Sequence, residues 1–553
     1  MSSSKSRSPS PASGQPEVLS TEYEKSTREA VESIVVAIVL AFLFRAFEAE
    51  AFVIPTGSMA PTLQGMHKHI TCPECGYEYK VGDSQMEDKV VATLCPSCFY
   101  TEQINPMNSK QRTHTGDRIL VNKFAYEDPF GEPKRWDIIV FKFPGNAKQN
   151  YIKRLVGLPG EELYIRAGDV YVRQPGEEDY TIAQKPPHKI KAMLQLVNDS
   201  NFRSETLDEI GFPTNWESTS DVWSAVDQGE SYECHASNEL AWLLYQHYAP
   251  SFGEWEQMLQ SGQPIAERRP ITDFYAYNSK SSYQTGHASP IGHNWVGDLA
   301  LECQIEVDSS EGQIVLDLIK AGRHHLLTID VSTGKATLEM DSLPFDTASG
   351  STVQTLHADT LVKGAGTYRL CFSNLDNQLT VWVNNGVVSF DESGSYSPPE
   401  LQVPRWSAAD PGDLTPIRIG LQGTAGRVRN LRVLRDVYYT NGAYVHEADV
   451  AVDQYQVWSR NHRLAGELSR HVPFSLSEDQ FFPMGDNSPH SSDARIWEQN
   501  RGSQPPIGNW VHRDYLIGKA VFVYWPAPVR ATIPGVGVSL PVFPNFSEMR
   551  LIR

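Results

Sequence analysis

The sequence contains few cysteines and no surplus of positive charge. Seven cysteines in 553 residues are too few for a disulfide scaffold, and three of them stand alone, as small core residues do: Cys234, Cys303 and Cys371. The formal net charge of −19 leaves no sustained basic face, which argues against nucleic acid as a partner. We find no internal repeat, and the length predicts about three or four domains.

A long apolar run is also missing, because Ile34–Phe44 contains only 11 residues and a bilayer span needs more. Extended to Ala30–Phe47, the stretch reaches 18 residues, and Arg45 near its end can reach the membrane interface. A buried soluble helix, a cleavable signal peptide and a retained single-pass anchor are all open interpretations. The long polar, acid-containing segment before the run favours the anchor.

The basic residues flank this run on one side. Lys5, Arg7, Lys25 and Arg28 precede it, and residues 46–67 contain no Lys or Arg. This bias predicts a cytoplasmic N-terminus, with the rest of the chain on the outer or periplasmic side of the cytoplasmic membrane. Membrane lipid is then a predicted partner, and the Ser- and Pro-rich residues 1–29 are predicted to be a disordered cytoplasmic tail.

Short β-type runs between Gly/Pro turns dominate the remaining chain and predict a mainly β fold. Four runs are expected to be strands: Arg118–Lys123, Asp137–Phe143, Tyr151–Val156 and Lys519–Tyr524. Period-two alternation over 299–307 and 379–383 indicates a β-sandwich. The stretch Glu239–Tyr248 favours a helix.

These patterns divide the chain into eight segments: tail 1–29, anchor 30–47, first β-domain part 48–65, cysteine-rich insertion 66–114, second β-domain part 115–175, mixed insertion 176–282, sandwich insertion 283–440 and third β-domain part 441–553.

Ser58 lies in the first of three chemically suggestive motifs, Ile54–Leu63 (IPTGSMAPTL). A serine beside glycine and between prolines sits in a tight turn, which suits a nucleophile but also an ordinary loop. A serine nucleophile needs a base, and no His/Asp arrangement is evident around it.

Lys153 lies in the second motif, Tyr151–Glu161 (YIKRLVGLPGE). A lysine in an apolar strand can lose its proton near neutral pH, because burial disfavours the ammonium form; the alternative is a solvated lysine on an edge strand. The third motif, Met484–Arg495 (MGDNSPHSSDAR), predicts a hydrogen-bonded turn, functional or structural.

Together these motifs resemble the conserved boxes of bacterial type I signal peptidases, which are serine–lysine peptidases. Gly116–Lys123 (GDRILVNK) resembles a further box, and Leu516–Ala520 with Tyr524–Pro526 resembles the closing strand. The resemblance covers the anchor and residues 51–65, 115–175 and 470–527. It implies the signal-peptidase β-fold with a transmembrane helix, and removal of signal peptides from secreted preproteins without a catalytic cofactor.

The resemblance also implies roles for individual residues. Ser58 matches the nucleophile, Lys153 the general base, and Ser491 the serine that orients the lysine. Thr56, with the Ser58 N–H, matches the oxyanion hole. A supporting polar network is matched by Asp486, Asp493 and Arg495. Pockets for small residues at −1 and −3 are matched by Phe52, Ile54, Met59, Leu63, Tyr151 and Ile152.

The motifs depart from the family pattern without losing a catalytic atom. Ala494 replaces a serine, Glu161 an aspartate, and Ser488–His490 a more polar stretch. The alternative function is an envelope-anchored glycan- or protein-binding protein whose peptidase domain is vestigial.

Four cysteines form two Cys-x-x-Cys pairs separated by 19 residues: Cys72, Cys75, Cys95 and Cys98. Four thiolates suit a structural tetrahedral zinc, as in a zinc ribbon; disulfides in an oxidising compartment are the alternative. Such a ribbon can also dock a partner such as the translocation machinery.

Trp295–Tyr438 resembles the concanavalin-like or laminin-G-like sandwich, a group that commonly binds glycans or proteins. A purely structural insertion is an equally open interpretation.

Overall fold

The chain is described here by a computed structural model. It describes residues 29–37, 39, 49–84, 89–105, 111–127, 129–279, 292, 294–399, 402–440, 473–499, 507–532, 539–543 and 545–553. Residues 29–37 and 39 are helical, but half of the predicted anchor and nearly all of the predicted tail lie outside the described residues. Within the described ranges, no helix has both the length and the apolar character needed to cross a bilayer.

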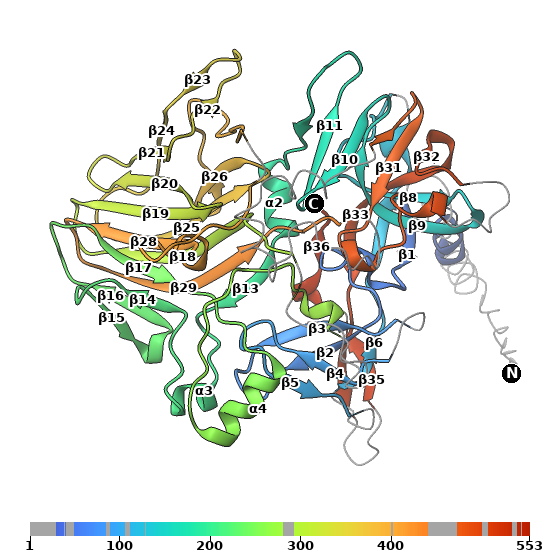
Figure 1. The fold of residues 1–553 in the computed structure, drawn as a ribbon. Coiled ribbons are helices and arrows are strands. Elements are labelled where there is room, and N and C mark those ends of the chain that lie inside the picture. The colour runs from blue at the N-terminus through green and yellow to red at the C-terminus, as the bar shows by residue number, and fades with distance from the viewer. Residues whose placement is uncertain are drawn as a thin grey trace, which may run out of the picture.

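The central sheet is built from segments that are far apart in the sequence, at the upper right of Figure 1. Every pair in it is antiparallel. Its strands, in spatial order, are β1 (Ala49–Val53), β7 (Arg118–Asn122), β33 (Leu516–Trp525), β8 (Ile138–Phe143), β9 (Asn146–Gly157), β31 (Gln480–Met484) and β32 (Val511–His512), with β36 (Arg550–Leu551) beside β33. The four strands predicted from the sequence are therefore confirmed.

A smaller sheet extends from the same part of the chain. Its order is β12 (Thr181–Ile182), β11 (Asp169–Arg173), β10 (Glu162–Arg166) and β30 (Phe474–Ser475). Alternate residues of β10 and β11 are buried, and Leu163 and Val172 pack in one core with Leu155 and Phe482 of the central sheet. The two sheets thus share a hydrophobic core, which fixes the strand that carries Lys153.

Two large sheets face each other at the left of Figure 1. The first contains β15 (Trp223–Val226), β16 (Ser231–Cys234), β29 (Gly426–Arg435), β18 (Leu299–Val307), β25 (Gly366–Leu375), β26 (Gln378–Val383) and β27 (Gly386–Val387), with β13 (Gln195–Asp199) beside β29. The second contains β14 (Trp216–Ser218), β17 (Ala241–Tyr245), β28 (Ile417–Gln422), β19 (Gln313–Lys320), β20 (Arg323–Asp330), β21 (Lys335–Met340) and β24 (Thr355–Asp359).

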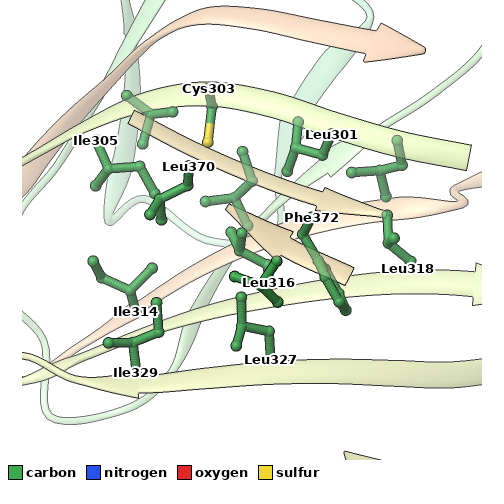
Figure 2. Close-up of a cluster of buried hydrophobic side chains, with 14 of the residues drawn as sticks. Leu301, Cys303, Ile305, Ile314, Leu316, Leu318, Leu327, Ile329, Leu370 and Phe372 are labelled. Carbon is green, nitrogen blue, oxygen red and sulfur yellow. The ribbon is translucent and has the colours of Figure 1, made fainter. Parts of the chain in front are cut away.

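Apolar side chains from both sheets meet between them. Figure 2 shows Leu301 and Cys303 of one sheet above Leu316 and Leu327 of the other, all in one buried cluster. The period-two pattern of the sequence places these residues on the inner faces. The three isolated cysteines are buried, as predicted.

The segment predicted to be a mixed unit, residues 176–282, contributes strands to both large sheets. The helix expected at Glu239–Tyr248 is wrong, because Ala241–Tyr245 forms strand β17. Ala241, Leu243 and Tyr245 are buried and the residues between them are half-buried, which is the period of a strand. Pairing with β28, far along the chain, overrides the local preference.

The cysteine-rich segment forms its own small sheets below the central sheet (Figure 1). Their strands are β2 (His67–Thr71), β3 (Glu78–Gly82), β6 (Thr113–His114), β4 (Ala92–Leu94) and β5 (Thr101–Gln103). Leu207 of α3 (Glu205–Glu209), and Trp255 and Met258 of α4 (Phe252–Ser261), pack in one cluster with the cysteines. The cysteine-rich segment and residues 205–276 therefore share a core.

The remaining described elements are short. They are α2 (Pro187–Met193), β22 (Phe345–Asp346), β23 (Thr352–Val353), β34 (Val529–Thr532), β35 (Ser539–Phe543), and the 3-10 turns η1 (Gly57–Met59), η3 (Lys123–Tyr126), η4 (Asp227–Gly229), η5 (Ala276–Asn278), η6 (Gly412–Leu414), η8 (Ser488–His490), η9 (Trp497–Gln499), η10 (Arg513–Tyr515) and η11 (Phe546–Glu548).

Candidate active site

Ser58 lies in the 3-10 turn η1, directly after the edge strand β1. Asp117 holds both ends of this loop: its backbone C=O accepts from the Ile54 N–H at 2.9 Å, and its carboxylate accepts from the Gln64 N–H at 2.9 Å. A Cβ on Gly116 would lie 1.8 Å from the Ile54 carbonyl oxygen, so glycine is required for this close approach. The Gly-Asp motif therefore anchors the serine turn.

Lys153 reaches Ser58 from a strand that three others separate from β1 in the same sheet. It lies in β9, opposite Ile139 of β8, and its Nζ is 2.7 Å from the Ser58 Oγ. Both side chains are buried. Burial lowers the pKa of Lys153 to about 8, although Asp493 and Asp486 nearby favour the ammonium form. A substantial fraction of Lys153 is therefore neutral at mildly alkaline pH, as a general base requires.

Arg154, the next residue, contacts the third motif. Its guanidinium donates to both carboxylate oxygens of Asp486 at 2.6 Å and to the Trp136 carbonyl at 2.7 Å. The Thr62 hydroxyl also donates to Asp486. The sequence motifs alone assign Arg154 no role. The signal was present, because a second cation in an apolar strand needs a buried anionic partner.

Asn487 connects the third motif to the serine turn. Its backbone N–H donates to the Ser58 carbonyl at 3.1 Å, and its side-chain N–H donates to the Gly57 carbonyl at 3.1 Å. A Cβ on Gly485 would lie 2.4 Å from the Ser58 carbonyl oxygen and 2.2 Å from the Ser491 Oγ. The backbone of the third motif therefore packs directly on the serine turn.

Asp493 and Arg495 form a second buried ion pair beneath Lys153. Arg495 donates to the two Asp493 oxygens at 2.8 and 2.7 Å, and the Gly485 N–H donates to the same carboxylate at 2.9 Å. Burial alone would raise the pKa of Asp493, but Arg495 and these hydrogen bonds lower it. Asp493 is thus a fixed negative charge near the lysine, and Arg495 offsets its effect on Lys153.

Ser491 and Thr56 are the two further hydroxyl residues predicted to belong to the site. Ser491 is fully buried, and its Oγ makes no hydrogen bond to Lys153 among the described residues. Its lysine-orienting role stays a prediction. Thr56 precedes the turn, is half-buried, and its side chain makes no capping hydrogen bond. Its hydroxyl is therefore not committed to the turn.

The six residues predicted to line substrate pockets fall into two groups. Ile54, Met59 and Leu63 are at most 3% exposed and belong to the core under the central sheet, so they shape a pocket only from beneath. Phe52, Tyr151 and Ile152 are half-buried. Of the six residues, only these last three are therefore accessible from the surface.

The four paired cysteines lie together. The Sγ–Sγ distances are 3.6 Å for Cys72–Cys98 and for Cys75–Cys95, and all four sulfurs lie within 4.8 Å of one another. All are free thiols, since a disulfide is only about 2.05 Å long. Hydrogen bonds from Cys75, Cys95 and Cys98 lower the pKa of Cys72. Tetrahedral zinc with sulfur at about 2.3 Å gives a spacing of about 3.8 Å, so the donor set fits that metal.

The chain is similar to known signal peptidases. The family described as "Signal peptidase, peptidase S26" matches residues 89–210 and 419–525, which contain Lys153 and the third motif, whereas Ser58 precedes the first range. A signal peptidase I of Leptolyngbya laminosa is 30% identical over 195 residues, covering 34% of this chain and 70% of that protein. The chain belongs to the signal peptidase family.

Further comparisons match other extents of the chain. A signal peptidase I of Pseudomonas aeruginosa is 39% identical over 98 residues, covering 14% of this chain and only 34% of that protein. The carbohydrate binding module CBM66 from Bacillus subtilis aligns with 40% of this chain and 95% of its own, with a TM-score of 0.22 and 10% identity. Much of this signal peptidase family member thus lies outside what it shares with its curated relatives.

Proposed function

We propose that this chain is a type I signal peptidase, an endopeptidase that removes signal peptides from secreted preproteins with a Ser58–Lys153 dyad. One observation carries the proposal: the Nζ of a buried lysine lies 2.7 Å from the Ser58 Oγ, and burial lowers the pKa of that lysine to about 8. A nucleophile within hydrogen-bonding distance of a base that is neutral near working pH is the requirement for acyl transfer.

The reaction proceeds in two steps. Neutral Lys153 accepts the proton of Ser58 as Oγ attacks the scissile carbonyl, and the Thr56 hydroxyl with the Ser58 N–H stabilises the oxyanion. Protonated Lys153 then gives the proton to the leaving amine. In the second step, neutral Lys153 activates a water molecule that hydrolyses the acyl-enzyme. Ser491 orients the lysine. The extended cleavage region adds beside β1, an edge strand of the sheet, by backbone pairing.

Residues 30–47 are proposed to be the single membrane anchor, with the N-terminus cytoplasmic and the dyad on the outer side. The lysine and arginine bias around the run supports this orientation. The substrate's apolar segment then lies in the same bilayer as the enzyme. The cysteine-rich segment and the sandwich are proposed to be insertions in the peptidase domain.

Zinc is proposed as a structural metal at Cys72, Cys75, Cys95 and Cys98. The four thiols converge without disulfides, and their side chains form the core of a segment too small to be stable alone. When bound, the metal cross-links β-turns of the ribbon, and it has no part in the peptide hydrolysis.

The function is tested with purified protein and a preprotein that carries Ala at −3 and −1. We expect one cut after the −1 residue, seen as a new N-terminus by mass spectrometry. Ser58→Ala serves as the inactive control. Intact substrate with the wild type, under conditions where its fold is verified, would contradict the proposal and favour a vestigial peptidase domain.

A second function, ligand binding by the sandwich, is favoured by one cavity of about 570 Å³ between the small sheet and the sandwich. Its lining combines aromatic rings with charged groups, among them Tyr171, Trp295, Tyr396, Asp298 and Lys320. Such mixed linings are typical of small-molecule sites. Oligosaccharides that raise the melting temperature of the wild type but not of Trp295→Ala would support it, and no shift with any of them would count against it.

A further inference from the structure

The inserted segment 176–282 reaches the serine turn through its 3-10 turn η5. Asn278 forms a reciprocal amide pair with Asn487: Asn278 Nδ2 donates to Asn487 Oδ1 at 2.7 Å, and Asn487 Nδ2 donates to Asn278 Oδ1 at 2.8 Å. The second side-chain hydrogen of Asn487 goes to the Gly57 carbonyl. Asn487 is therefore held between the serine turn and the insertion.

Tyr277 contacts the other side of the same turn. A Cβ on Gly57 would lie 2.3 Å from the Tyr277 ring, so the ring lies directly against the residue before Ser58. The Tyr277 hydroxyl donates to the Met66 carbonyl at 3.5 Å. The turn thus touches the third motif through Asn487 and the insertion through Tyr277.

The cysteine-rich segment fixes η5 in turn. The Ser279 Oγ accepts from the Leu94 N–H at 3.1 Å, is 2.9 Å from the Thr93 hydroxyl, and donates to the Ala276 carbonyl at 2.6 Å. Ala276 packs in the same core as Cys72, Cys95 and Cys98. A continuous set of contacts therefore runs from the cysteine cluster through Ser279 and Asn278 to Asn487 and Ser58.

We propose that Asn278 is a positioning residue for the Ser58 turn, contributed by the insertion and held in place by the cysteine-rich segment. It acts through Asn487: without Asn278, one N–H and the Oδ1 of Asn487 lose their partners, and the amide that holds the Gly57 carbonyl is free to rotate. A nucleophile displaced by about 1 Å reacts about 100-fold more slowly. Only the expected change in kcat rests on the proposed function.

The test compares Asn278→Ala and Asn278→Asp with Asn215→Ala in the full chain. Asp has the size of Asn but lacks the N–H donor, so it separates hydrogen bonding from packing. Asn215 is a matched control, because it also bonds another amide side chain, Asn198, and the Gln246 carbonyl, and both partners lie within the same insertion. We measure kcat and KM on a signal-sequence peptide, and hydrogen exchange of residues 57–66.

We expect both Asn278 variants to lower kcat about tenfold with KM within twofold, and to speed hydrogen exchange in residues 57–66. Asn215→Ala should change neither. If Asn278→Asp keeps the wild-type kcat and the wild-type hydrogen exchange of residues 57–66, the proposal is overturned. This outcome decides the question even if Asn278→Ala folds poorly. If the wild type cleaves nothing, the proposed function fails, whereas the exchange measurement still decides the role of Asn278.

Discussion

Arg154 donates to both oxygens of Asp486 at 2.6 Å, and the side chains of both residues are at most 1% exposed. The pair joins the strand of Lys153 to the third motif across 332 positions of sequence. Burial lowers the pKa of Arg154, but Asp486 more than compensates, so that the pKa is raised overall. The charges are therefore stable only as a pair.

Asp486→Asn should destabilise the fold strongly, because it leaves Arg154 buried without its counter-charge. Breaking one partner of a buried pair costs about 3–5 kcal/mol, measured by urea unfolding. Asp479→Asn is the control, since Asp479 is 57% exposed and 3.5 Å from Arg513; such pairs contribute about 0–1 kcal/mol. Equal losses for the two variants would show that the Arg154–Asp486 pair is not a stabilising contact.

Ser58→Ala and Lys153→Ala should each abolish cleavage and leave the fold intact. The double variant should be no slower than either single one, because nucleophile and base act as a unit. Lys153→Arg should be equally inactive, since arginine does not lose its proton. Rates are measured on a preprotein and folding by circular dichroism. Near-normal turnover by Lys153→Ala would exclude the Ser–Lys mechanism.

Activity should rise with pH through the pKa of Lys153, which burial lowers to about 8. Below that pH the ammonium form dominates and cannot accept the serine proton, so kcat/KM falls as pH falls. Above it the neutral amine dominates and the rate reaches a plateau. The kcat/KM profile of the free enzyme is the measurement. A flat profile between about pH 6 and 9 is incompatible with this base.

Gly485→Ala should reduce activity sharply, because the added Cβ would lie 2.4 Å from the Ser58 carbonyl oxygen and 2.2 Å from the Ser491 Oγ. The turn must shift, and a shift of the nucleophile of about 1 Å costs up to about 100-fold in rate. Gly253→Ala in helix α4 is the control, since no atom lies within 4 Å of its added Cβ. Full activity of Gly485→Ala would mean that the third motif does not fix the serine.

Cys72→Ser with Cys75→Ser should remove a bound metal. We expect about one zinc per wild-type chain by elemental analysis, and partial loss of activity in the double variant as the shared core loosens. Cys234→Ala should keep the metal, because Cys234 lies outside the cluster. No metal in the wild type, with the four cysteines oxidised, would establish disulfides instead.

The sequence indicated the candidate residues Ser58 and Lys153 better than it indicated their surroundings. Ser58 and Lys153 lie in motifs that contain the residue types a nucleophile and its base require. The local pattern of apolar residues predicted strands β8 and β9. Arg154 could not be assigned a partner, because Asp486 lies 332 positions away and no local pattern indicates the pairing. The strand at Ala241–Tyr245 was missed for the same reason, since its partner β28 is remote. The Asn278–Asn487 contact forms only in the tertiary fold, so the sequence alone does not predict it.

Strand β33 (Leu516–Trp525) lies between β7 and β8 and pairs with both. Strands β7 and β8 therefore cannot become part of one continuous sheet until the chain has been synthesised up to residue 525. Pairing between such distant segments is slow, whereas the intervening sandwich pairs largely within itself. The nascent chain is thus expected to fold from the middle outward, and the sheet that carries Lys153 is completed only after β33 has been synthesised.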